Sequence, residues 1–139
     1  ASATRSAMPS SSSVDDEQAV DAVQRYYAAF NAALTTLDTK EMRTLFQPGC
    51  IVCEQDVAEL DRMARAGERV TGGATSLANL SVTLRSENLL GIRATATSAA
   101  MTIKDRSGKV LLNESAVTAT KNFTVSHVDG RCAVEGITK

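Results

Sequence analysis

The residues whose types and spacing could do chemistry begin with a pair of cysteines. Cys50 and Cys53 are three positions apart, directly after Pro48-Gly49, at the start of a predicted helix. Residues at this spacing lie about one helical turn apart, which brings their α-carbons within the roughly 5 Å that a disulfide needs. We therefore expect a disulfide between Cys50 and Cys53 that fixes the corner between two helices.

Two other uses of the cysteines remain open. A cysteine at the N-terminus of a helix has a favoured thiolate, so the pair could form a thiol redox site with a solvent-accessible sulfur at Cys50. A zinc site would combine Cys50 and Cys53 with Cys132 and His127, which lie opposite each other in the predicted sheet. Alone, Cys132 is typical of a small buried residue. The disulfide is the favoured interpretation, with no metal and no cofactor.

His127 and three aromatic residues are the candidates for a pocket. His127 is the only histidine and lies beside a predicted hairpin turn on the inner face of the sheet, where a pocket role and a solvated position are both open. Tyr27 lies on the buried face of the first predicted helix, so its ring belongs to the core and its hydroxyl needs a partner. The possible pocket residues are Tyr27, Phe30, Phe123 and His127.

Three helices should position these groups, over residues 14–37, 38–46 and 53–66. In the first, apolar residues recur at spacings of three and four, which is one face of a helix about six turns long. The second opens on Asp38 with Glu41 three positions later, the spacing of a capping box. The helices therefore occupy the front half of the chain.

The back half is predicted to form antiparallel strands, because after Gly72-Gly73 the apolar period changes to two. The strands are residues 75–85, 89–103, 110–126 and 132–138. Asp129-Gly130 is a two-residue hairpin turn that sets the register of the last pair. The expected partners are Val128 with Arg131, His127 with Cys132, Val125 with Val134, Lys104 with Lys109, Ala96 with Val117, Ala94 with Ala119, Leu90 with Phe123, Leu84 with Leu90, Val82 with Ile92 and Leu80 with Ala94.

This register divides the sheet into an apolar and a polar face. The face expected to meet the helices collects Leu80, Val82, Leu84, Leu90, Ile92, Ala94, Ala96, Val117, Ala119, Phe123, Val125 and Val134. The outer face carries Ser81, Thr83, Arg93, Thr95, Thr97, Glu114, Thr118, Thr120, Thr124 and Glu135. Such a threonine-rich surface suits water or a contact in a homodimer.

Composition limits the class of protein. The chain of 139 residues has a net charge of -1, with 4% aromatic residues and no tryptophan. These values disfavour a partner that is a nucleic acid, since neither a basic excess nor stacking platforms are present. Residues 1–13 lack an apolar run and end in serines, which predicts a flexible lead before a single domain of residues 14–139.

The element order resembles the nuclear transport factor 2-like superfamily, a cone-shaped α+β fold shared with ketosteroid isomerases. The similarity covers residues 14–138 and is carried by Tyr26-Tyr27-Ala28-Ala29-Phe30-Asn31 and by the stretch from Asp38 to Leu45-Phe46. It implies an α+β domain in which three N-terminal helices pack on one face of a curved antiparallel sheet.

Within that superfamily the chain looks similar to exported lipoproteins of high-GC Gram-positive bacteria. These proteins similarly have a Pro-x-Cys-x2-Cys-like element and a later Gly-Gly, here residues 48–53 and Gly72-Gly73. The resemblance implies export to the cell envelope or the extracellular space. The lipid-bearing cysteine of these proteins has no counterpart in residues 1–13, so a membrane contact would require a lipid anchor outside this sequence.

An isomerase or dehydratase on this fold would need a carboxylate or histidine base that projects into the cone. In the predicted register no strand carboxylate does so, because Glu114 and Glu135 lie on the outer face. Only Asp38, Asp56 or Asp61 could serve, and no catalytic residue is assigned. The favoured function is therefore an exported, non-catalytic domain that offers an apolar cavity or a sheet face to a small apolar ligand or a protein partner. An isomerase-like enzyme and a thiol redox protein are the alternatives.

Overall fold

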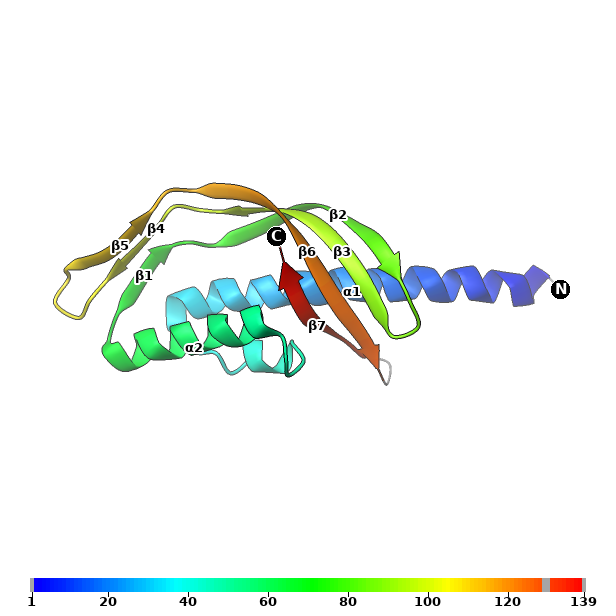
Figure 1. The fold of residues 1–139 in the computed structure, drawn as a ribbon, viewed down its shortest axis with the longest axis horizontal. Coiled ribbons are helices and arrows are strands. Elements are labelled where there is room, and N and C mark those ends of the chain that lie inside the picture. The colour runs from blue at the N-terminus through cyan, green and yellow to red at the C-terminus, as the bar shows by residue number, and fades with distance from the viewer. Residues whose placement is uncertain (1, 129–130, 139) are drawn as a thin grey trace.

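The computed structural model describes the backbone of residues 2–128 and 131–138 and the side chains of residues 16–127 and 132–138. Figure 1 shows two helices beneath a strongly curved layer of strands. The elements are α1 (Ser2–Thr36), the 3-10 helix η1 (Met42–Thr44), α2 (Ile51–Ala66), β1 (Arg69–Gly72), β2 (Thr75–Arg85), β3 (Leu89–Ser98), β4 (Met101–Lys104), β5 (Val110–Glu114), β6 (Val117–Val128) and β7 (Arg131–Thr138). The chain is an α+β protein.

The first helix begins earlier than predicted. Helix α1 runs from Ser2 instead of residue 14, and its N-terminal part extends past the sheet in Figure 1. Its buried residues from Ala19 to Leu34 recur at the helical spacing that the sequence predicts. The division into a lead of residues 1–13 and a domain of residues 14–139 stays a prediction.

The second predicted helix is only the three-residue η1, so the described residues form two α-helices and not three. The predicted capping box does not form, because the Asp38 carboxylate accepts a hydrogen bond from the amide of Lys40 at 3.0 Å and thus makes a local turn. Met42 alone among the residues of η1 is buried. This short segment nevertheless makes the corner between α1 and α2 that was expected.

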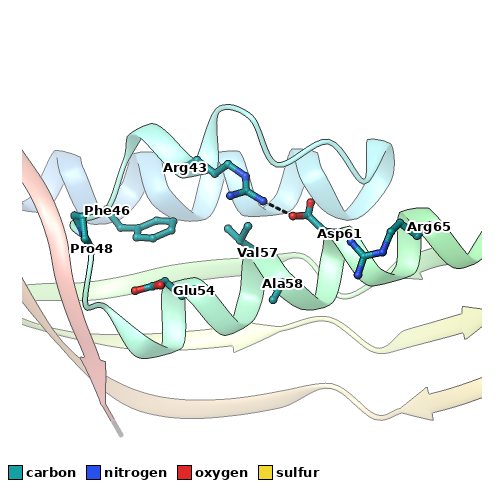
Figure 2. A pocket seen from close by; sticks show the side chains of 8 residues that line it. All are labelled: Arg43, Phe46, Pro48, Glu54, Val57, Ala58, Asp61 and Arg65. Carbon is teal, nitrogen blue, oxygen red and sulfur yellow. Dashed lines mark hydrogen bonds and ion pairs between the residues drawn. The ribbon is translucent and has the colours of Figure 1, made fainter.

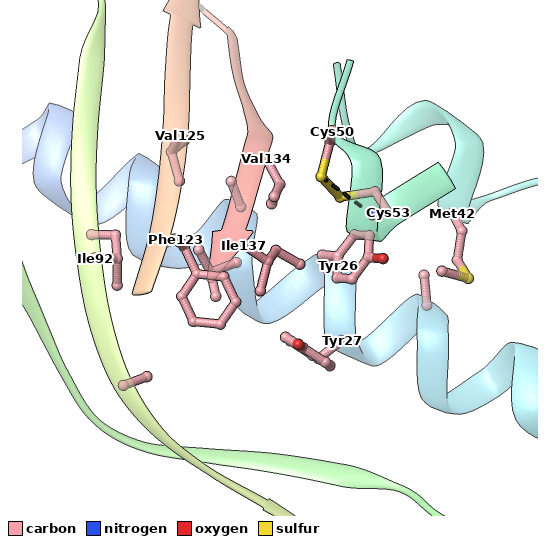
Figure 3. Close-up of a cluster of buried hydrophobic side chains, with 14 of the residues drawn as sticks. Tyr26, Tyr27, Met42, Cys50, Cys53, Ile92, Phe123, Val125, Val134 and Ile137 are labelled. Carbon is pink, nitrogen blue, oxygen red and sulfur yellow. Dashed lines mark hydrogen bonds between the residues drawn. A yellow bond between two sulfur atoms is a disulfide. The ribbon is translucent and has the colours of Figure 1, made fainter. Parts of the chain in front are cut away.

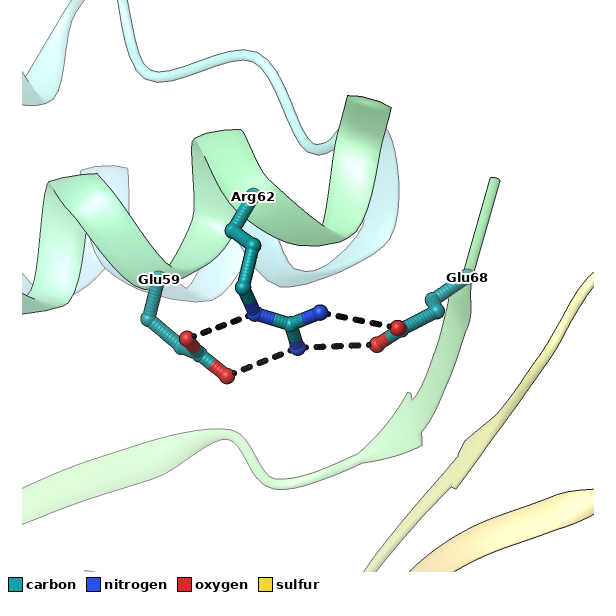
Figure 4. A network of polar contacts seen from close by, with 3 residues as sticks. All are labelled: Glu59, Arg62 and Glu68. Carbon is teal, nitrogen blue, oxygen red and sulfur yellow. Dashed lines mark hydrogen bonds and ion pairs between the residues drawn. The ribbon is translucent and has the colours of Figure 1, made fainter. Parts of the chain in front are cut away.

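Helix α2 has clear caps at both ends. The Cys50 sulfur accepts a hydrogen bond from the Cys53 amide at 3.4 Å, and Gly67 ends the helix with a φ of 75°. Near this end of the helix, Arg62 donates hydrogen bonds to the carboxylate of Glu59 in α2 and to that of Glu68, which follows Gly67, at 2.9–3.0 Å (Figure 4). These contacts tie the last turns of α2 to the segment that enters β1.

The strands form two antiparallel sheets instead of one meander. The larger sheet has the order β2-β3-β6-β7, and the smaller has the order β1-β4-β5. The predicted strands 89–103 and 110–126 each break in two, at residues 99–100 and 115–116, and their halves join different sheets. The sequence reasoning also missed β1, which supplies the third strand of the smaller sheet.

Gly72 marks the place where the two sheets part. It has a φ of 78°, and a Cβ at this position would lie 2.1 Å from the carbonyl oxygen of Ala100. Only glycine allows this backbone conformation and this close approach together. The bend at Gly72 faces the break after β3, so the layer of strands curves over the helices as a cone.

The predicted hairpin register is confirmed for β6 and β7, with Val128 opposite Arg131, His127 opposite Cys132 and Val125 opposite Val134. Val82 also faces Ile92 as predicted. The other predicted pairs differ. Irregularities in the ladders place Leu84 opposite Gly91 and Lys104 opposite Val110, and Leu80 lies within an irregular stretch. The ladder between β3 and β6 is regular, but it pairs Ala96 with Ala119, Ala94 with Lys121 and Leu90 with Val125. The shift between β3 and β6 is two residues, which leaves each side chain on its predicted face.

The inner face forms the core, as predicted for most of its residues. Ile92, Phe123, Val125 and Val134 are buried and pack with residues of the helices (Figure 3). Leu84 and Val117 are exceptions, because they are 55% and 59% exposed. The residues of the polar outer face are exposed or half-buried.

Candidate functional site

A cavity of about 220 Å³ lies between the two helices and the parted sheets. Its walls include Tyr27 and Phe30 from α1, Val52 and Asp56 from α2, and Lys121 from β6. The rest of its lining comes from β2, β3, β4, β5 and the segments that join them. The cavity is less open than the larger hollow on the outer side of α2, and it brings apolar side chains and ionisable groups together.

Asp56 is one of two carboxylates that line this cavity, and it is bound by Tyr26. The hydroxyl of the fully buried Tyr26 donates to Oδ2 of Asp56 at 2.9 Å. Burial raises the pKa of Asp56 above its ordinary value, although the Tyr26 hydrogen bond and the charge of Lys121 act in the opposite direction. Burial and the nearby Asp56 carboxylate raise the pKa of Tyr26 far above its usual range, so its hydroxyl stays a donor.

Lys121 and Tyr27 form the opposite polar part of the cavity. The ammonium of Lys121 donates to the Tyr27 hydroxyl at 3.5 Å and lies 5.8 Å from the centre of its ring. Burial, followed by the Asp56 charge, raises the pKa of Tyr27 well above its usual range. Lys121 is half-buried because it lies on the inward side of β6, between Ala119 and Phe123. Lys121 was not among the predicted pocket residues, although the alternation of side chains along β6 predicts that it lies on this side.

A third part of the wall is tied together by its own hydrogen bonds. The Asn31 amide donates to the carbonyl of Thr75 at 2.9 Å and accepts from the Thr75 amide at 2.8 Å. The hydroxyls of Thr75 and Ser98 lie 3.0 Å apart. These bonds fix the start of β2 against α1 and the end of β3, which keeps this wall of the cavity in place.

Glu114 corrects the prediction that no strand carboxylate faces the hollow. It belongs to β5 and lines the cavity, together with Ser115 and Val117. The predicted register treated residues 110–126 as one strand, in which Glu114 faces outward. The break after Glu114 separates β5 from β6, so the alternation of β6 does not extend to this residue.

Only two of the predicted pocket residues line the cavity. Tyr27 and Phe30 do so, and their rings pack edge to face with centres 6.0 Å apart. Phe123 is buried behind them, with its ring 5.9 Å from that of Tyr27. His127 lies opposite Cys132 in the β6–β7 hairpin, and its amide donates to the carbonyl of Asn88. His127 is not among the residues that line the cavity.

Of the three carboxylates that could have served as a base, only Asp56 reaches the cavity. Asp61 accepts hydrogen bonds from Thr39 and Arg43 on the other side of α2. Asp38 makes its local turn at the surface. The position of Asp56 follows from α2 itself, because it lies four residues after Val52 and therefore on the same face of the helix.

The structure joins Cys50 and Cys53 by a disulfide with an S–S distance of 2.08 Å and a Cα–Cα distance of 5.3 Å. Both cysteines are completely buried. They lie beside Tyr26 in the core (Figure 3). The alternative of a thiol redox site would require an accessible sulfur at Cys50, whereas the core covers both sulfurs. Across the described side chains, no group of three or more His, Cys, Asp or Glu residues is placed to hold a metal ion.

A second hollow of about 460 Å³ lies on the outer side of α2, lined by Arg43, Phe46, Pro48, Glu54, Val57, Ala58, Asp61 and Arg65 (Figure 2). It is open to solvent, and three of its charged groups already have partners within the protein. Arg43 forms an ion pair with Asp61, and Glu54 accepts from the amide of Gly49 at 2.9 Å. The less open cavity between the helices and the sheets, with Tyr27 buried and Asp56 and Lys121 half-buried, is the stronger candidate for a functional site.

Comparison with models of known protein families and with curated sequences finds no match. Within the described residues, no helix combines the length and the apolar character needed to cross a membrane.

Solved structures resemble the chain in fold. The intermembrane-space region of the chloroplast protein ARC6 aligns with a TM-score of 0.62 and 13% identity, over 85% of this chain and 90% of that one. The association domain of CaMKII from C. elegans aligns with a TM-score of 0.51 and 12% identity, over 88% and 95% of the two chains. A candidate scytalone dehydratase from Novosphingobium aromaticivorans has a TM-score of 0.51 and 13% identity, over 85% and 80%.

These likenesses establish the fold. Helices packed against a curved antiparallel sheet give the chain the nuclear transport factor 2-like, cone-shaped α+β architecture. The neighbours include proteins with quite different descriptions, so function has to be argued from the cavity itself.

Proposed function

We propose that this chain is a binding domain that takes one small molecule into the cavity between α1, α2 and the two sheets. The observation that carries the proposal is the half-open cavity of about 220 Å³, whose lining combines apolar side chains with several polar groups. Phe30 and Val52 offer apolar contact, while Asp56 and Lys121 offer charged groups. The ligand therefore has an apolar body and at least one polar group, which modifies the purely apolar ligand that the sequence predicts.

Export is the second part of the proposal. A disulfide persists in oxidising surroundings and is rare in proteins of the reducing cytosol. The Cys50–Cys53 bridge thus supports a site of action in the cell envelope or outside the cell. Release of this chain into the medium or the envelope fraction of its native host, followed with an antibody, tests this part.

A blocked cavity tests the binding function. Val52 is half-buried and lines the cavity, whereas its neighbour Ile51 is 69% exposed. We expect Val52→Trp to fill the space and to abolish the binding of small fragments detected by ligand-observed NMR. Ile51→Trp adds the same ring outside the cavity and should leave binding unchanged. Equal binding by wild type and both variants would overturn the proposal.

A second candidate function is proton transfer in the same cavity. It is favoured by the position of Asp56, whose Oδ2 accepts a hydrogen bond from Tyr26 at 2.9 Å and whose pKa is raised above its ordinary value by burial, which makes the carboxylate a stronger base. A base of this kind would remove a proton from a carbon next to a carbonyl group. Lys121 and Tyr27 would then stabilise the negative charge that develops on the carbonyl oxygen.

Hydrogen–deuterium exchange on carbon tests this candidate without knowledge of the product. A panel of small cyclic ketones in D₂O should show faster exchange with the wild-type protein than with Asp56→Asn. If the protein binds fragments but every ketone exchanges at the rate seen in buffer alone, the proton-transfer function is ruled out and the binding function remains.

A further inference from the structure

We propose that Lys121 and Tyr27 form an oxyanion subsite, so that the cavity selects small ligands that carry a carboxylate or a similar anionic oxygen. This inference rests on the proposed ligand cavity and adds the chemical class of its ligand. Lys121 belongs to β6 and Tyr27 to α1, and both line the cavity. Their polar atoms lie 3.5 Å apart, close enough to reach the same carboxylate.

The first argument is the number of unused donors. A lysine ammonium has three N–H groups, and among the described residues the structure gives Lys121 a single hydrogen-bond partner, the Tyr27 hydroxyl. That hydroxyl accepts from Lys121, which leaves its own hydrogen to donate. Within the same part of the chain, no protein acceptor for this hydrogen is found. The Lys121 ammonium and the Tyr27 hydroxyl can therefore both donate to a ligand or to water in the cavity.

The second argument is charge. A half-buried ammonium binds a charged acceptor more strongly than a neutral one, because the surroundings screen less than water does. Asp56 does not take this role directly: its Oδ2 accepts from Tyr26, and no ion pair within 4.0 Å joins it to Lys121 in the described structure. The charge of Lys121 reaches Asp56 only through space, where it lowers the pKa of that carboxyl.

The remaining charged group is Glu114, which lies in β5 on the wall of the cavity. Glu114 is exposed, so solvent screens its repulsion of an anion more than it screens the attraction of the half-buried Lys121. The groups that face a bound oxyanion are thus Lys121 and Tyr27 as donors, and Asp56 and Glu114 as carboxylates. Tyr26 is engaged with Asp56 and does not compete.

Benzoate and benzamide test the inference, because they share shape and differ in charge. Binding is followed at neutral pH by amide chemical shifts of residues around the cavity. We expect benzoate to bind about tenfold or more tightly than benzamide. Lys121→Met should remove this preference while benzamide still binds. Lys109→Met removes the same charge from the exposed β4–β5 connection and should leave the preference intact.

The outcomes separate this inference from the function it rests on. If fragments bind wild type but not Val52→Trp, and benzoate shows no advantage, the oxyanion subsite is overturned and the binding cavity stands. The same conclusion follows if neither probe binds while other fragments do. An advantage for benzoate that persists in Lys121→Met also overturns the subsite. If no fragment binds at all, the cavity proposal and the subsite fail together.

Discussion

At the scale of single residues, Asp56 is the group whose ionisation the fold opposes. Its carboxyl is half-buried, and burial raises its pKa in spite of Tyr26 and Lys121. A carboxyl with a raised pKa in the folded state binds its proton more readily there than in the unfolded chain. Stability from this group is therefore greatest below the ordinary pKa of aspartate and is lost as the pH rises through the raised value.

Asp56→Asn should remove this pH dependence. The asparagine resembles the protonated acid, and its oxygen can still accept from Tyr26. We expect wild type to lose stability relative to the variant as the pH rises from about 4 to about 8, so that the variant is the more stable protein at neutral pH. Urea unfolding across this range measures the difference. A wild type that gains on the variant with rising pH would contradict the assignment.

The candidate site was predictable in part from the sequence. Tyr27 follows from the helical period, and Asp56 was one of three carboxylates that remained possible. Lys121 could have been included, since it shares the inward side of β6 with Phe123. The position of Glu114 in the cavity wall could not be predicted, because it depends on a strand break that no residue pattern in the sequence indicates. Neither could the Tyr26–Asp56 bond, which joins residues 30 positions apart through the packing of two helices.

At the scale of elements, the disulfide closes a very short loop at the start of α2. The chain-entropy estimate for so short a loop is about 2 kcal/mol, and removal of the bridge should lower the free energy of unfolding by about that amount. The double variant Cys50→Ala and Cys53→Ala, compared with wild type by urea unfolding, measures it. A matched variant, Cys132→Ala, keeps the bridge.

Thiol chemistry provides the complementary check. The Cys132→Ala protein should show no reactive thiol while it is native and oxidised, and two after unfolding with reductant. Two thiols in the native oxidised protein would rule out the bridge.

Gly72 is the element-scale position where a single methyl group should do most harm. Gly72 and Gly108 both have positive φ, at 78° and 94°, so alanine strains the backbone at either site. Only at Gly72 does a Cβ also meet another backbone atom, the Ala100 oxygen. We expect Gly72→Ala to lose about 2 kcal/mol more than Gly108→Ala in urea unfolding. Equal losses would show that the contact with Ala100 relaxes without penalty.

The elements show where sequence reasoning succeeds and where it stops. Alternation identified the faces of β3 and β6, and Asp129-Gly130 fixed the register of the last hairpin, because both signals are local. The bulges near Asn79 and Leu84 and the breaks at residues 99–100 and 115–116 are set by how the strands curve around the helices. β1 is four residues long, and it is a strand only because β4 lies beside it.

At the scale of the whole molecule, the two sheets should differ in stability. The larger sheet supplies the buried residues of β3, β6 and β7, whereas every residue of β5 in the smaller sheet is exposed. Opening the smaller sheet uncovers little apolar surface, so it should open more often. Native-state hydrogen exchange should be roughly 100-fold or more slower at Ile92 and Phe123 than at Leu112 and Asn113. Similar rates in both sheets would mean that they unfold as one unit.

The two adjacent tyrosines of α1 restrict how this protein could acquire a new ligand. Tyr26 and Tyr27 point to neighbouring parts of the same core, where each ring packs against other aromatic rings. A substitution at either tyrosine would change both the packing of the core and the binding of a ligand in the cavity. A substitution at Lys121 or Glu114 should change ligand binding without disturbing the apolar core, because neither residue belongs to it. Divergence among descendants of this chain should therefore concentrate at those two positions, with the tyrosine pair inherited unchanged.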